Sequence, residues 1–119
     1  MNNLQFTFRP IDVWPGELSR GRSRSQFKAS KSDTDTLLLR ELRHLNAKSI
    51  VIQLALGEGD IRLDGLPRAS ARPHHPGVIL AFDSSFGPLK YATDRFDNWQ
   101  DNLRGIALGL EALRKVDRY

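Results

Sequence analysis

The sequence contains no cysteine, so disulfide bonds and thiolate metal sites are excluded. It also lacks an apolar run long enough to cross a bilayer, and residues 1–10 hold no apolar stretch of signal-peptide length. These absences are typical of a protein that works in a reducing compartment. We therefore expect a cytoplasmic protein that has no membrane partner.

Catalytic motifs are scarce as well. No serine lies in a GxSxG strand-to-helix turn, and no glycine-rich phosphate loop precedes a predicted helix. His74 and His75 are adjacent, so their side chains diverge in an extended chain, and no third ligand follows at metal-site spacing. We therefore expect no catalytic residue, no metal site and no cofactor from these motifs.

The 119 residues are enough for one domain with its own core. Alternating and apolar stretches predict strands at residues 4–9, 26–29, 49–56, 61–64, 78–82 and 89–91, with 49–56 and 61–64 forming a hairpin. A helix capped at Ser32 is predicted over residues 32–46, with Leu38, Leu42 and Leu45 on its buried side. This order predicts an α+β fold, in which two helices pack on one face of a small antiparallel sheet of hairpins.

A long C-terminal helix is the predicted core element. Its apolar residues recur at gaps of three and four, which places them on one face: Phe96, Trp99, Leu103, Ile106, Leu110 and Leu113. Gly105 and Gly109 form a second stripe, and each glycine costs about 1 kcal/mol in a helix interior. The stripe therefore predicts close approach of a neighbour, which is the sheet, the first helix, a further part of the chain, a partner protein or a second copy in a homodimer.

The helical pattern continues to the last residue without a glycine cap. The 119 residues are therefore either a whole domain or the N-terminal module of a longer protein.

Basic residues gather in two predicted loops of a chain whose net charge is +4. The first loop holds Arg20, Arg22, Arg24, Lys28 and Lys31, and the second holds Arg68 and Arg72 with His74 and His75. If the loops are neighbours, they form one positive patch suited to nucleic-acid phosphates, whereas separate loops would be solvated surface. Trp14 and Trp99 are expected to pack in or beside the core.

Acidic residues crowd the predicted start of the long helix, where Asp94, Asp97 and Asp101 fall within one sector. Acids there complement the helix dipole. Clustered carboxylates also hold divalent metals in nucleases. The segments Asp101-Asn102-Leu103 and Glu111-Ala112-Leu113 resemble the helix of phage-type Holliday-junction resolvases, although Gly105 replaces the lysine of that family. A metal-dependent nuclease is therefore the alternative function.

Three segments together are similar to another family. They are residues 13–18 with 25–30, residues 35–56, and residues 75–81 with 91–119. As a set they resemble the N-terminal region of J-domain-containing proteins from actinobacteria and their phages. The J domain itself follows this region, and its His-Pro-Asp motif is not matched, because His75-Pro76 is followed by Gly77. The resemblance implies a phage or prophage origin and no co-chaperone activity in this chain.

The sequence thus predicts a non-catalytic binding module of phage or prophage type, which acts through a partner protein or nucleic acid. The alternative function, a metal-dependent nuclease, differs from the binding module because it requires a cluster of carboxylates that can hold a metal.

Overall fold

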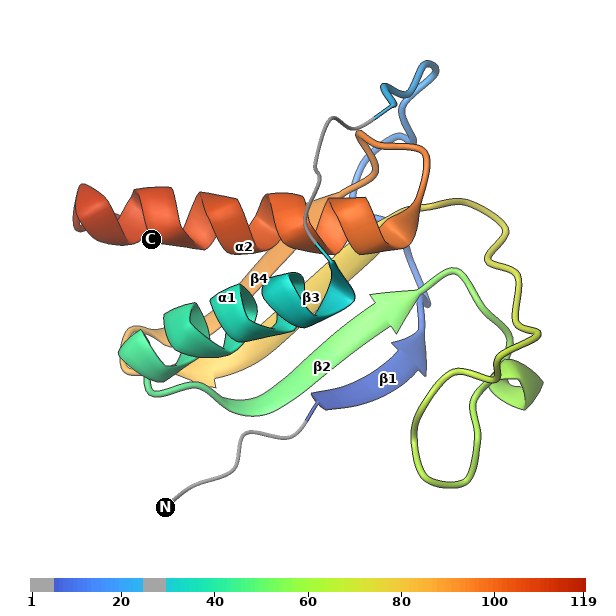
Figure 1. The fold of residues 1–119 in the computed structure, drawn as a ribbon, viewed down its shortest axis with the longest axis horizontal. Helices are drawn as coiled ribbons and strands as arrows, with labels where there is room; N and C mark the ends of the chain where they lie inside the picture. Colours follow the sequence, from blue (N-terminus) through green and yellow to red (C-terminus); the bar gives the residue numbers. More distant parts are fainter. Residues whose placement is uncertain (1–5, 25–29) are drawn as a thin grey trace.

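The strands form one mixed sheet that carries both helices on a single face (Figure 1). The computed structural model describes residues 6–24 and 30–119. The elements follow the order β1 (Phe6–Pro10), α1 (Lys31–His44), β2 (Lys48–Leu54), the 3-10 turn η1 (Glu58–Asp60), β3 (Val78–Ser84), β4 (Gly87–Thr93) and α2 (Trp99–Lys115). The sheet order is β1-β2-β3-β4. The predicted α+β fold is confirmed, including the placement of the C-terminal helix on the sheet.

The prediction of a purely antiparallel sheet is wrong, because β1 pairs with β2 in parallel, with Phe6 opposite Ile50. Helix α1 connects these two strands as a crossover, and a crossover returns the chain in the same direction. The predicted hairpin of residues 49–56 with 61–64 is also wrong. Both edges of β2 are already taken by β1 and β3, so residues 61–64 stay outside the sheet. The strand predicted at residues 26–29 lies outside the described residues.

One core lies between the sheet and the helices. Leu38, Leu42 and Leu45 are fully buried, as the spacing predicted. On α2, Leu103, Ile106 and Leu110 are buried, together with Ala107 from the adjoining sector. The remaining predicted positions lie at the margin: Trp99 and Leu113 are partly buried, and Phe96 precedes the helix. The spacing of the apolar residues therefore predicted the buried face of α2 correctly. Only the positions at the two ends of the apolar stripe lie outside the core.

Side-chain caps fix where each helix begins. Ser30 caps α1, because its Oγ accepts from the Asp33 backbone N–H at 3.1 Å and Asp33 accepts from the Ser30 backbone N–H at 3.1 Å. The helix was predicted to be capped by Ser32, and the observed cap lies closer to the N-terminus, at Ser30. Asn98 caps α2, since its Oδ1 accepts from the Asp101 backbone N–H at 2.8 Å. Both helices begin at the end of the molecule where β1 and β2 finish (Figure 1).

A buried ion pair joins the two helices. The Glu41 side chain on α1 is fully buried and accepts from Arg114 of α2 at 2.7 and 3.1 Å. Burial raises the pKa of Glu41, but the bonds from Arg114 and Arg40 outweigh burial and hold that pKa below its ordinary value. The carboxylate therefore stays charged in the core and fixes the helices relative to each other.

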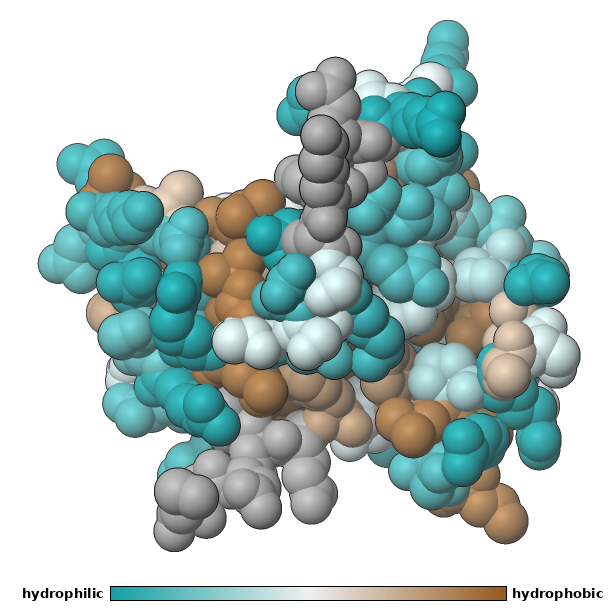
Figure 2. All heavy atoms as spheres, viewed as in Figure 1, coloured by the Kyte–Doolittle hydropathy of each residue, from teal (hydrophilic) through white to brown (hydrophobic). Residues whose placement is uncertain are grey.

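The glycine stripe has no close neighbour in the described residues. A Cβ on Gly109 would meet no heavy atom within 4 Å, and one on Gly105 would meet only the Phe96 ring, at 3.5 Å. The prediction that the sheet or the first helix packs tightly against the stripe is therefore wrong. On the face of the molecule that Figure 2 shows, the surface over the helices is largely hydrophilic, with apolar residues visible between them. No helix in the described residues is long and apolar enough to span a membrane.

Leu110→Ala should lower the free energy of unfolding by about 2–5 kcal/mol, because a fully buried leucine leaves a cavity. Leu113→Ala, at a partly exposed position of the same helix, should cost clearly less. Urea unfolding followed by circular dichroism measures both. Equal costs at the two positions would show that the buried face of α2 is wrongly assigned.

Gly109→Ala should stabilise the protein by up to about 1 kcal/mol, because alanine favours the helix and its Cβ has open space here. Thermal unfolding of the variant, beside Gly105→Ala, provides the measurement. A loss of stability at Gly109 would reveal a neighbour on this side of α2, such as a second copy of the chain.

Candidate functional site

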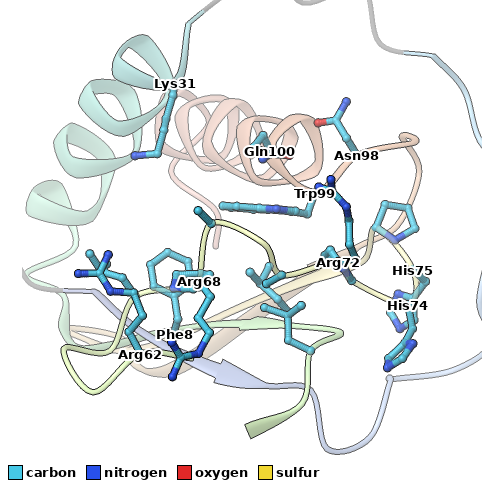
Figure 3. A pocket seen from close by; sticks show the side chains of 18 of the residues that line it. Phe8, Lys31, Arg62, Arg68, Arg72, His74, His75, Asn98, Trp99 and Gln100 are labelled. Carbon is cyan, nitrogen blue, oxygen red and sulfur yellow. The ribbon is translucent and has the colours of Figure 1, made fainter. Parts of the chain in front are cut away.

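A basic cleft of about 820 Å³ opens where both helices begin (Figure 3). The start of α2 forms one wall, the loop of residues 56–76 forms the other, and Lys31 reaches in from the start of α1. The positively charged or titratable lining residues are Lys31, Arg62, Arg68, Arg72, His74 and His75. In the part of the chain that the structure describes, Asp97 is the one acidic residue that lines this cleft. The predominance of cations makes the cleft attractive to anions.

The loop is held in shape by its own backbone. The Arg62 N–H donates to the Leu66 carbonyl at 2.7 Å, and Gly65 takes the positive φ of +86° that the turn between them requires. The Arg68 N–H donates to the Asp60 carbonyl at 2.7 Å, and the His74 N–H donates to Ala55 at 2.9 Å. These bonds close the loop of residues 56–76 on itself and on the end of β2, and Arg68 and Arg72 of this loop line the cleft.

The cations of the cleft differ in how far they are neutralised. Lys31 pairs with Asp35 at 3.0 Å, and Arg62 pairs with Asp64 at 2.6 Å. In the described residues Arg68 and Arg72 have no carboxylate partner. The Arg68 Nε donates to the neutral carbonyl of Gly59 at 2.8 Å. These two arginines therefore contribute most of the uncompensated positive charge.

Aromatic rings lie beside these charges. Trp99, the first residue of α2, meets Phe8 of β1 edge-on, with ring centroids 6.2 Å apart. Both rings line the cleft and also a second hollow of about 540 Å³ between the helix starts and β1. Lys31, Leu66 and Gln100 line both hollows too. The two hollows therefore adjoin along shared side chains.

Asn102 fixes the position of the α2 wall. Its side chain is fully buried. Its Oδ1 accepts from the Phe96 N–H at 2.9 Å, and its Nδ2 donates to the carbonyls of Pro76 at 2.8 Å and Phe96 at 3.1 Å. One side chain thus ties the end of the loop to the segment that leads into α2.

The first predicted basic loop is placed differently from the second. Lys31 does line the cleft with Arg68 and Arg72, whereas Arg20 and Arg24 are exposed and do not line it. Lys28 lies outside the described residues. The structure therefore brings three of the predicted cations together, namely Lys31, Arg68 and Arg72.

Arg22 has a structural role in the first loop. Its Nη2 lies 3.3 Å from the Asp94 carboxylate, and its Nε donates to the Asp94 carbonyl at 3.1 Å. The backbone N–H and the Oγ of Ser19 each donate to the same carboxylate at 2.6 Å. Burial raises the pKa of Asp94, but the Ser19 bonds and the Arg22 charge outweigh burial and hold that pKa below its ordinary value. This contact fastens the first loop to the β4–α2 junction.

The three aspartates of the alternative reading have separate environments. Asp94 is buried against Ser19 and Arg22, Asp101 accepts from the Asn98 amide at 2.7 Å, and Asp97 is exposed at the cleft. The described ranges contain no group of three or more His, Asp or Glu side chains that could hold a metal ion. The geometry therefore gives the metal-dependent nuclease no support.

Trp14 packs outside the cleft against the end of the loop. Its ring meets His75 edge-on at a centroid distance of 5.4 Å. A Cβ on Gly77 would lie 2.6 Å from the Trp14 ring, so only glycine fits there. The Nδ1 of His75 accepts from the Gly77 N–H at 3.1 Å. Burial, followed by the charge of Arg22, lowers the pKa of His75, so this imidazole is neutral at pH 7.

One cation of the cleft is not predicted from the sequence. Arg62 falls in a predicted strand that does not form, whereas His74 and His75 belong to the predicted second basic loop and do line the cleft. The basic character of the segment from Arg62 to His74 was the signal that could have found Arg62.

No family model, curated protein or solved structure matches this chain. The resemblance to J-domain-containing proteins therefore stays a prediction.

Asp94→Asn should lower the free energy of unfolding at pH 7 by roughly 1–3 kcal/mol, because it removes a charge that holds several hydrogen bonds. The Asp94 pKa is lowered in the folded state, so this stabilisation is present above the ordinary value of 3.8 and is lost as pH falls through the folded-state pKa. The difference between wild type and variant should therefore shrink in acid.

Urea titrations at pH 7 and in acid below the ordinary pKa measure this difference. Asp97→Asn is the matched control, since Asp97 is exposed and should change stability by less than about 0.5 kcal/mol. A pH-independent difference at Asp94 would show that its charge does not act as described.

Proposed function

We propose that this protein is a non-catalytic module that binds nucleic acid through the phosphate backbone in the basic cleft. The proposal is carried by Arg68 and Arg72, two arginines without a carboxylate partner in the described residues, on a loop held in place by backbone bonds. Guanidinium groups match phosphate oxygens in geometry and in charge. Lys31 and Arg62 are two further cations of the cleft. Each is paired with a surface carboxylate, and because such pairs are weak, a phosphate can replace the carboxylate.

The size of the site favours a polymer over a single phosphate group. The cleft and the adjoining hollow have volumes of about 820 and 540 Å³; the loop wall of the cleft carries three arginines, and Lys31 lines both spaces. Successive phosphates of one strand can therefore contact Arg62, Arg68, Arg72 and Lys31 in turn. The net charge of +4 assists the approach of such a polyanion.

The chemistry of the lining favours binding over catalysis. Among the described residues, those that line the cleft include no serine, threonine, tyrosine or cysteine, so they offer no hydroxyl or thiol nucleophile. Asp97 is the one carboxylate among these lining residues, whereas nucleases that use metal ions need several. The cleft is therefore suited to hold phosphates without cleaving them.

The double variant Arg68→Gln/Arg72→Gln should weaken the binding of a fluorescent oligonucleotide on the order of tenfold or more at low salt. Each lost phosphate contact should also reduce the magnitude of the negative slope of log K against log salt by about 0.7 to 0.9. Fluorescence anisotropy over a salt series measures both quantities. Wild type should bind in the micromolar range or more weakly at physiological salt.

Arg20→Gln/Arg24→Gln is the matched control, because it removes the same charge from exposed positions outside the cleft. It should change the affinity and the salt slope much less. Equal effects of the two double variants would show that only net charge matters. Absence of binding by wild type at low salt would reject the nucleic acid in favour of a partner protein.

A further inference from the structure

The position of Trp99 points to more than phosphate contact. Phosphates need no aromatic surface, yet this indole lies in the cleft beside the cations and also lines the adjoining hollow (Figure 3). The indole packs against the core and is only partly buried, so part of its surface stays exposed. An accessible indole next to arginines can take the flat face of a nucleobase.

The indole is held ready for such a contact. Trp99 is the first residue of α2, where the Asn98 cap and the buried Asn102 fix the backbone. Phe8 meets the ring at an interplanar angle of 76° and limits its rotation. Because the ring is already ordered, stacking a base on it would cost little conformational entropy.

The charges lie where a strand that stacks on Trp99 would place its phosphates. Figure 3 shows the indole between Lys31 and Arg72, with Arg62 and Arg68 on the opposite loop wall. Sites for single strands combine stacking rings with cations that follow the backbone in this way. A duplex keeps its bases stacked inside and would present only its phosphates to the cleft.

We infer that the cleft binds single-stranded nucleic acid, with one unpaired base stacked on Trp99 and the flanking phosphates on Arg68, Arg72 and Lys31. The inference rests on the proposed function and narrows its ligand to a strand with exposed bases. Every base has a stacking face, so the preference among base sequences is weak.

The test compares an oligothymidylate of about ten nucleotides with an abasic oligomer of the same length and with a duplex. The first two probes carry the same phosphates, and only one carries bases. Wild type should bind the oligothymidylate about 5- to 100-fold more tightly than the abasic oligomer, which is the usual contribution of one stacked base. It should bind the duplex more weakly than the oligothymidylate.

Trp99→Leu should abolish the preference for bases and leave the affinity for the abasic oligomer unchanged, since leucine keeps apolar contact with Phe8 but has no stacking face. Trp14→Phe is the control, because Trp14 lies outside the cleft and is the other tryptophan of the chain. In that variant the emission of Trp99 should be quenched by the oligothymidylate and not by the abasic oligomer. This fluorescence measurement tests the stacking of a base while Trp99 itself is unchanged.

The outcomes separate the two proposals. If wild type binds the oligothymidylate and the abasic oligomer equally, and Arg68→Gln/Arg72→Gln weakens both, the base on Trp99 is rejected while the phosphate site stands. A duplex bound more tightly than the single strand also overturns the inference. If no probe binds at low salt, the proposed function fails together with the inference.

Discussion

The buried amide of Asn102 is the contact on which the cleft depends. It bonds to the backbone of Phe96 on one side and to the carbonyl of Pro76 on the other. Neither partner belongs to a helix or a strand, so no ladder of backbone hydrogen bonds would hold them together otherwise. A buried amide that loses its partners costs free energy, which makes this arrangement specific as well as stable. The cleft thus has a rigid wall although loops form much of its lining.

The chain path explains why the cleft lies at this end of the molecule. Helix α1 follows β1, and α2 follows β4, and both strands run toward the same end (Figure 1). Both helices therefore begin there, and each helix start carries a partial positive charge. The capping acids Asp33 and Asp101 offset part of that charge. The arginines of the loop then determine how positive this end of the molecule is.

Features that depend on the spacing of residues within one helix were predicted correctly from the sequence. Features that depend on which strands or side chains pair in the folded protein were not. The spacing of Leu38 and Leu110 with their neighbours is a property of one helix, so the core was predicted correctly. The alternation of residues 61–64 looked like a strand, but a strand needs a free sheet edge, and β2 had none. Arg22 looked like a free cation, since a sequence does not show that Asp94 lies beside it. The cleft was predicted in part, because Arg68 and Arg72 were recognised while the part played by Arg62 required the fold.

The contact of Trp14 with Gly77 makes two distant positions interdependent. Because a Cβ at position 77 would lie within 2.6 Å of the indole, the side chain tolerated at one position is set by the residue at the other. Substitutions at the two positions are therefore expected to be non-additive: a smaller residue at position 14 removes the contact of the ring with alanine at position 77 and leaves the contact of 2.8 Å with the His75 Nδ1. Related sequences would show this constraint as covariation, in which glycine at position 77 persists as long as a large ring occupies position 14.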